Sequence, residues 1–178
     1  GYYQGNASAG RSVYVGFQPD AVFVKRVGAV TDRWSVLRTS SMTGDNTKDL
    51  DNAGLALAAN LVQSLTATGF TVGSDARVNE SARDYYWVAF RAGAGGMKVG
   101  QYAGTGAATV SISGVGFQPD FVIVMPNLTS DPNGIPVFTS STFPADTSFD
   151  FDATQRGPNC IRALEADGFQ VGTGNGVE

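Results

Sequence analysis

The hexapeptide VGFQPD occurs twice in this chain, at Val15–Asp20 and again at Val115–Asp120. The match extends well beyond six residues. The segment 3–24 (YQGNASAGRSVYVGFQPDAVFV) corresponds to 102–124 (YAGTGAATVSISGVGFQPDFVIV) with one residue inserted. VLRTSSMTGDNT (36–47) then corresponds to PVFTSSTFPADT (136–147), and NLVQSLTATGFTVG (60–73) to NCIRALEADGFQVG (159–172). Three blocks in one order, spaced by 99 or 100 residues, indicate two copies of one module.

The repeat divides the 178 residues into three parts. We predict a first repeat at 1–92, a Gly-rich linker at 93–100 and a second repeat at 101–178. The second copy reaches GFQVGTGNGVE, which is level with Asn79 and Glu80 of the first. We therefore expect the second repeat to lack a counterpart of the strand YYWVAF (85–90).

Composition and local pattern favour strands. The chain has 23 Gly residues, and 42% of its residues are hydrophobic, with many Val and aromatic residues. DAVFVK (20–25) and DFVIVM (120–125) predict strands buried on both faces, whereas TVSIS (109–113) and DYYWVAF (84–90) alternate as half-exposed strands do. Short strands with frequent turns predict an all-β fold of two tandem β-sandwich modules, jelly-roll-like, each with one short helix or helical turn.

The predicted helices are LVQSL (61–65) and CIRAL (160–164). Each has apolar residues at positions i, i+1 and i+4, and Gly69 and Gly168 follow as helix-ending residues. Cys160 corresponds to Leu61 of the other copy, so we expect a small buried hydrophobic residue and not a reactive thiol.

Several functional classes are disfavoured. The net charge of −4 argues against a nucleic-acid partner, and no apolar run is long enough to span a membrane. The chain contains no histidine and one cysteine, which removes Ser-His-Asp and Cys-His catalytic groups and the commonest zinc ligands. We therefore predict that the protein is not an enzyme and has no cofactor and no tightly bound transition metal.

Three groups of residues remain as candidates for a site. GDNTKDLDN (44–52) is a weak calcium candidate through Asp45, Asp49 and Asp51, with a solvated loop as the alternative. Asp20 and Asp120 are expected to accept backbone N–H bonds at a turn, in preference to a catalytic role.

The third group comprises Tyr85 and Trp87, which are candidates for an aromatic platform that binds sugars or another protein. N-glycosylation sequons begin at Asn6, Asn79 and Asn127, and the sequence does not decide whether they are used.

GFQPDFVIV, the TSS that follows, ALEADGFQVG and YYWVAF together resemble a repeat module of predicted secreted bacterial proteins and phage tail-associated proteins. Members of that family have a GF-x-PD strand, a Ser/Thr-rich stretch, an A-D-GF-x-V-G turn and a YYWVAF strand. The resemblance covers nearly the whole chain and implies display outside the cell or on a virion surface. It implies no reaction.

We expect a structural subunit of an extracellular filament, surface layer or phage tail-type appendage, with a homo-polymer as partner. The alternative is a carbohydrate-binding or adhesive module whose partners are surface glycans. The missing strand predicts a groove beside Phe169 and Val171, filled either by a segment of a neighbouring subunit or by continuation of the chain past Glu178. For the first case the expected donor is the N-terminal segment GYYQG, through Gly1, Tyr2 and Tyr3. The host, the symmetry of the polymer and any ligand are not determined by the sequence.

Overall fold

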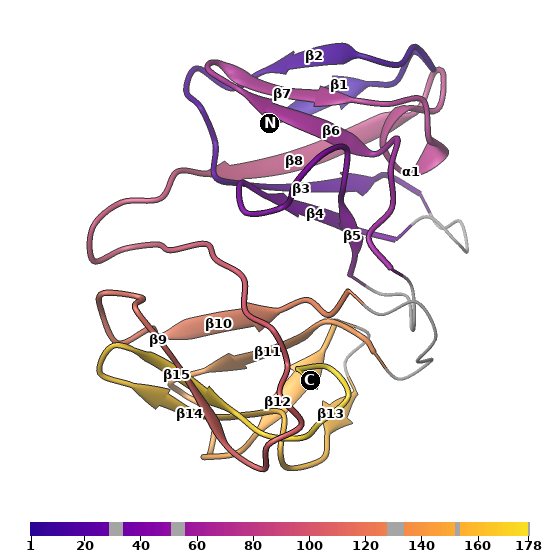
Figure 1. The fold of residues 1–178 in the computed structure, drawn as a ribbon. Helices are drawn as coiled ribbons and strands as arrows, with labels where there is room; N and C mark the ends of the chain where they lie inside the picture. Colours follow the sequence, from indigo (N-terminus) through magenta and orange to yellow (C-terminus); the bar gives the residue numbers. More distant parts are fainter. Residues whose placement is uncertain (29–33, 51–55, 128–133, 152–153, 178) are drawn as a thin grey trace. The chain divides into compact units, whose positions relative to one another are not determined.

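The computed structural model describes residues 1–28, 34–50, 56–127, 134–151 and 154–177. The described part of the chain is all-β, as the sequence predicts, with antiparallel strand pairs and one four-residue helix, α1 (Ala76–Asn79). It divides into two compact units (Figure 1). The first comprises Gly1–Leu50 and Leu57–Gly100, and the second is made chiefly of Gln101–Glu178.

The first unit contains a larger and a smaller sheet. The larger sheet has the order β1 (Tyr2–Gln4), β8 (Asp84–Phe90), β3 (Ala21–Arg26), β4 (Val36–Thr39) and β5 (Lys48–Asp49). The smaller sheet has the order β2 (Arg11–Tyr14), β7 (Gly69–Val72) and β6 (Val62–Thr66). Strand β8 therefore lies in the interior of the larger sheet, between β1 and β3.

The second unit repeats this plan with fewer strands. Its larger sheet has the order β10 (Phe121–Val124), β11 (Val137–Ser140), β12 (Ser148–Asp150) and β13 (Gln155–Arg156). Its smaller sheet has the order β14 (Ile161–Glu165), β15 (Gly168–Val171) and β9 (Val110–Ser113). Among the described strands, none takes the place that β8 has in the first unit.

Each unit has its own apolar core, to which both of its sheets contribute. In the first unit Val22 and Tyr85 of the larger sheet belong to the same buried cluster as Phe70 and Val62 of the smaller sheet. In the second unit Val122 and Val137 cluster with Ile161 and Val171. Burial of these apolar faces is the dominant force that holds two sheets together. Cys160 belongs to the second core, which confirms the prediction of a small buried hydrophobic residue.

The prediction of two helices is wrong. The segment 61–65 lies mostly in strand β6 and 160–164 mostly in strand β14, and each strand pairs with the next one in a hairpin. Gly69 and Gly168 begin the second strands of these hairpins and do not end helices. Both hairpins have a β-bulge at the same place, between Val62 and Ser64 and between Ile161 and Ala163.

The hydrogen bonds also correct the alignment of the two copies around TSS. Ser40 N donates to Asp20 O, and the matching bond runs from Ser141 N to Asp120 O. The side chain of Asp45 accepts from Asn60 N as that of Asp146 accepts from Asn159 N. Residues 36–47 therefore correspond to 137–148, one position later than the sequence overlay places them. In the corrected register Arg38 corresponds to Thr139 and not to Phe138.

Candidate functional site

Strand β10 differs from its counterpart in having an unpaired edge. Strand β3 pairs with β4 on one side and with β8 on the other, from Ala21↔Phe90 to Arg26↔Tyr85. Strand β10 pairs with β11 alone among the described strands. Phe121, the first residue of β10, is 52% exposed, whereas the matching Ala21 is 3% exposed. The prediction that these strands are buried on both faces is wrong for both of them: one face of each reaches solvent, through Phe121 in β10 and through Lys25 in β3.

The N-terminal segment is not a free donor strand. Tyr2–Gln4 form β1, which pairs with β8 of the same unit in the register Tyr2↔Tyr86. The amino group of Gly1 donates to Trp87 O. The ring of Tyr3 is buried and stacks on that of Tyr85, with 5.2 Å between centroids. The expectation that Gly1, Tyr2 and Tyr3 are available for donation is thus wrong: these residues complete their own sheet.

The groove expected beside Phe169 and Val171 is largely closed by the second unit itself. The side chain of Val171 is fully buried, and the ring of Tyr102 lies edge-on to that of Phe169 at 6.3 Å. In the first unit it is Trp87 that meets Phe70 in this way, at 5.8 Å. Tyr102 also donates to Val177 O, just as Tyr3 donates to Val78 O. What remains open is the edge of β10.

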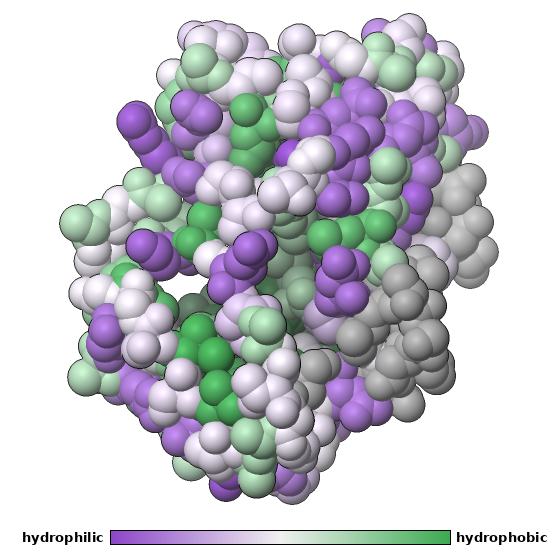
Figure 2. Space-filling view, viewed as in Figure 1, coloured by the Kyte–Doolittle hydropathy of each residue, from purple (hydrophilic) through white to green (hydrophobic). Residues whose placement is uncertain are grey.

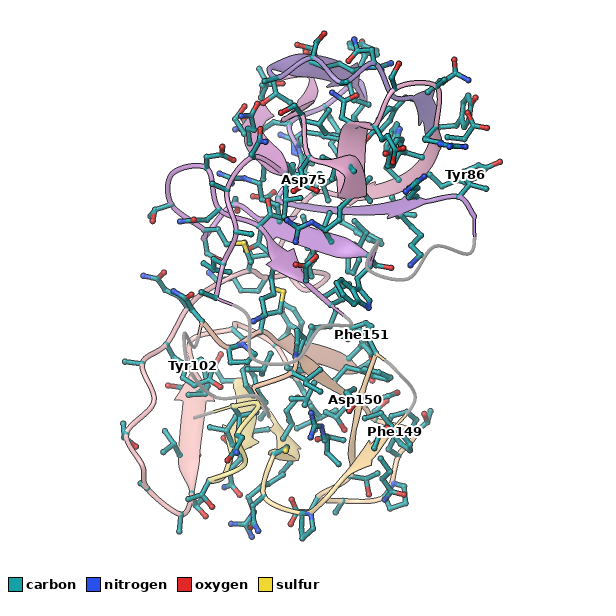
Figure 3. The ribbon with its side chains drawn as sticks, turned by 90° about the vertical axis from the view of Figure 1, so that its right-hand side faces the viewer. Asp75, Tyr86, Tyr102, Phe149, Asp150 and Phe151 are labelled. Carbon is teal, nitrogen blue, oxygen red and sulfur yellow. The ribbon has the colours of Figure 1, made fainter. Side chains whose placement is uncertain are left out.

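The aromatic strand β8 alternates as predicted, but its two faces have the opposite roles to those expected. Tyr85 is fully buried, with its hydroxyl donating to Ala76 O, and Trp87 packs against the core. These two residues are therefore not an exposed platform. The exposed face carries Tyr86, Val88 and Phe90, which are 60%, 53% and 45% exposed. Figure 3 shows the side chain of Tyr86 pointing away from the first unit.

Exposed and half-buried aromatic side chains gather on the larger sheet in both units. In the first, Tyr2 contacts Tyr86 and Phe23 contacts Phe90. In the second, five rings contact one another across β10, β11 and β12 and the adjoining loops; they belong to Phe121, Phe138, Phe143, Phe149 and Phe151. Figure 2 shows hydrophobic groups reaching the surface between hydrophilic ones on the face drawn there.

The acidic stretch of the first unit uses its described carboxylates internally. Asp45 accepts hydrogen bonds from Asn60 N and from the side chain of Gln63. Asp49 is buried and forms an ion pair with Arg77. The third calcium candidate, Asp51, lies outside the described residues. Within the described parts of the chain, no three His, Cys, Asp or Glu side chains come together as metal ligands would.

The two aspartates of the repeated hexapeptide have different surroundings. Asp20 accepts from the hydroxyl of Ser40 and from Ala92 N, so it does bind a backbone N–H, although not one of its own turn. Asp120 is exposed and borders a surface hollow.

Of the sequon residues, Asn79 is fully buried, accepts from Asn6 N and donates to Gly73 O. Glycosylation of Asn79 is incompatible with this fold.

The hollow beside Asp120 is a feature that sequence reasoning missed. It has a volume of about 660 Å³ and lies entirely within the second unit. Its walls are the turn 118–120, the segment 139–146 other than Thr142, and residues 161–164 of β14. We call it the Thr139 hollow, after the buried threonine of β11 at its wall. Residues of the repeated GFQPD and TSS blocks both border the hollow. Their repetition was the feature of the sequence that could have pointed to this site.

Comparison with protein-family models, with curated proteins and with solved structures found no match to this chain. In the described residues, no helix combines the length and the apolar character that crossing a membrane requires.

Proposed function

We propose that the protein is a structural subunit of an extracellular filament, surface layer or phage tail-type appendage, which assembles through its β-modules. The unpaired edge of β10 carries this proposal. An open sheet edge is a template for another strand, and natural monomers commonly cover or charge such edges. The edge strand β10, Phe-Val-Ile-Val, has no charged or proline residue that would discourage pairing.

The occupant we propose is an extended segment of another subunit with apolar residues at alternate positions, as in β8. The internal repeat supports this choice, because the matching edge of β3 is occupied by β8 over six residue pairs. Strand addition supplies main-chain hydrogen bonds along the edge, and side chains at alternate positions supply selectivity. A contact of this kind between different surfaces of successive subunits does not close on itself, so it builds a filament.

The finer description of the fold belongs to the same proposal. The two sheets of each unit, which contribute to one apolar core, support two tandem jelly-roll-like sandwiches. The resemblance of the repeats to modules of secreted bacterial and phage tail-associated proteins supports a location outside the cell or on a virion.

The test combines assembly state with peptide binding. We expect the sedimentation coefficient of the chain to rise with protein concentration, and negative-stain images to show polymers. A labelled peptide with the sequence of residues 80–91 should bind and should inhibit polymer growth, whereas a scrambled peptide should do neither.

A matched pair of variants locates the contact. Phe121→Lys places a charge at the open edge of β10 and should abolish both polymer growth and peptide binding. Phe90→Lys places the same charge on a similarly exposed aromatic residue of β8, which is already paired with Ala21 of β3, and should change neither. A chain that stays monomeric at every concentration and ignores the peptide would refute the proposal. Peptide binding by a chain that never polymerises would refute the homo-polymer.

A carbohydrate-binding or adhesive function is the second candidate. The exposed rings of Tyr2, Tyr86 and Phe90 favour it, because aromatic faces are a common support for sugar rings. A glycan array would test this function. Binding that Tyr86→Ala removes would support it, and an array without signal would exclude the glycans tested.

A further inference from the structure

The Thr139 hollow lies where the first unit has a buried arginine side chain. Arg38 of β4 is 6% exposed, and its guanidinium is bound by three backbone carbonyls. Nη1 donates to Asn46 O at 2.5 Å and to Val62 O at 3.2 Å, and Nη2 donates to Gly44 O at 2.7 Å. The carbonyls come from the loop after β4 and from β6, so Arg38 joins these two elements.

The second unit has the three corresponding carbonyls but no arginine among them. In the register fixed by the matched hydrogen bonds, Thr139 takes the place of Arg38, and Ala145, Thr147 and Ile161 supply the corresponding carbonyls. Thr139, Ala145 and Ile161 all border the hollow. The hydroxyl of Thr139 donates to Thr147 O at 2.7 Å, and so satisfies one of the three carbonyls.

Ile161 O retains room for a second donor. In the first unit Val62 O accepts from both Thr47 Oγ1 and Arg38. In the second unit Ile161 O accepts from Ser148 Oγ, the counterpart of Thr47, at 3.3 Å. A carbonyl oxygen has two lone pairs, so the position that Arg38 uses in the first unit is free for a ligand.

The charged groups of the hollow also favour a cation. Its walls include the carboxylates of Asp120 and Asp146 and a single basic side chain, Arg162. That guanidinium is engaged at the rim: its Nη1 donates to Thr109 Oγ1 and Ala108 O, and its Nε lies 3.8 Å from Asp146 Oδ2. Asp146 is held in place by its backbone N–H, which donates to Arg162 O.

We propose that the Thr139 hollow binds the guanidinium group of a ligand between Ala145 O, Ile161 O and the carboxylate of Asp146. A planar guanidinium presents five N–H donors in fixed directions and suits a set of converging oxygen acceptors. The hollow, at about 660 Å³, is within the usual range for ligand sites and has room for a whole arginine residue with its flanking backbone. The source is an arginine side chain of a protein or a free guanidinium compound.

Titration of the full chain tests this site. N-methylguanidinium, arginine amide and the peptide Gly-Arg-Gly are added separately, and the amide signals of residues 139, 145, 146 and 161 are followed by NMR. We expect saturable shifts with all three ligands. Urea has nearly the same shape without the charge, and it should cause no saturable shift at equal concentration. Tighter binding of the peptide than of N-methylguanidinium identifies a protein ligand, and equal binding identifies a small one.

Two reciprocal substitutions complete the test. Thr139→Arg supplies the hollow with its own guanidinium and should weaken ligand binding by at least about tenfold. Arg38→Thr should empty the matching place in the first unit, so the number of binding sites should rise from one to two. Should Thr139→Arg fail to fold, Arg38→Thr and the unaltered chain still decide the matter. No saturable shift in the unaltered chain, equal response to urea, or an unchanged affinity in folded Thr139→Arg would each overturn the proposal. None of these results depends on the β10 edge.

Discussion

At the scale of single residues, the most demanding groups are two buried aspartates at matching positions. Asp49 and Asp150 are 1% and 2% exposed. Asp49 pairs with Arg77 of α1, whereas Asp150 pairs with Arg156 of β13 at 3.0 Å. A buried carboxylate is costly without a partner. Each unit solves the same problem with an arginine from a different element.

Removing Arg77, the partner of Asp49, should destabilise the fold strongly. We expect Arg77→Met to lower the free energy of unfolding by about 3 kcal/mol at pH 7, because it leaves a buried carboxylate without its cation. Urea denaturation measures the loss. Arg83→Met is the control: Arg83 is 56% exposed and 3.7 Å from Glu80, so its removal should cost less than about 1 kcal/mol.

The sign of the pH dependence follows from Asp49. Burial raises the pKa of Asp49 above its usual 3.8, and Arg77 and Lys48 oppose this while Asp75 adds to it. Without Arg77 the pKa of Asp49 in the folded state rises further, so protonation relieves the folded state as pH falls. The difference between Arg77→Met and the unaltered chain should therefore shrink from pH 7 towards pH 4. A difference that grows over this range would contradict the assignment.

The carboxylate of Asp167 should affect the pH dependence of stability in the opposite direction to that of Asp49. Its carboxylate accepts from Gly116 N at 2.6 Å and from Gly114 N at 3.1 Å, and these two bonds lower the pKa of Asp167 below 3.8. The stabilisation is present above pH 3.8 and is lost as pH falls through the lowered value. We expect Asp167→Ala to lower the urea midpoint at pH 7, and to lower it less as the pH falls below 3.8. An effect of the same size at every pH would show that the carboxylate charge is not responsible.

At the scale of elements, the hairpins β6–β7 and β14–β15 depend on a glycine. A Cβ at Gly168 would lie 1.9 Å from Ile112 O of the neighbouring strand, and a Cβ at Gly69 would lie 2.0 Å from Val13 O. The φ of Gly168 is also +152°. We expect Gly168→Ala to destabilise the chain by more than about 2 kcal/mol, because a strand would have to move. Urea denaturation of Gly157→Ala, a position with no atom within 4 Å of the added Cβ, should show almost no change.

The same hairpins show why part of the fold could not be predicted. A bulge between Val62 and Ser64 shifts the alternation of β6, so that Val62 and Leu65 both contact the core. In a regular strand residues three apart face opposite sides, so the spacing looked helical. The strands β8 and β9 have no such irregularity, and their alternation was predicted correctly.

Which face of β8 turns inward was not predictable from its alternation. Tyr85 is drawn into the core by its stack on Tyr3 and by the bond of its hydroxyl to Ala76 O, and both partners are distant in sequence. The Thr139 hollow was not predicted from the sequence for a related reason. The sequence overlay placed Arg38 opposite Phe138, and only the hydrogen bonds show that it corresponds to Thr139.

At the scale of the whole molecule, two cores imply two unfolding events. Among the described residues the first core contains 11 buried side chains and the second 7, and the second unit lacks a β8-like strand. We expect calorimetry to show two transitions, with the second unit unfolding at the lower temperature.

Glycine substitutions assign the two transitions. Gly168→Ala should shift only the lower transition, and Gly69→Ala only the upper one. A single transition that both substitutions shift equally would show that the units unfold as one.

The extra Gly114 of the second unit has a practical consequence for engineering. The turn after β9 contains one residue more than the turn after β2, yet both strands keep the same register with their hairpins. The second unit therefore accommodates a longer turn at this place without a change in the pairing of its sheet. The junction between Tyr14, which is 76% exposed, and Val15 is accordingly a place to insert an affinity tag or a reporter peptide. Such a tagged chain would allow single copies to be followed by fluorescence microscopy.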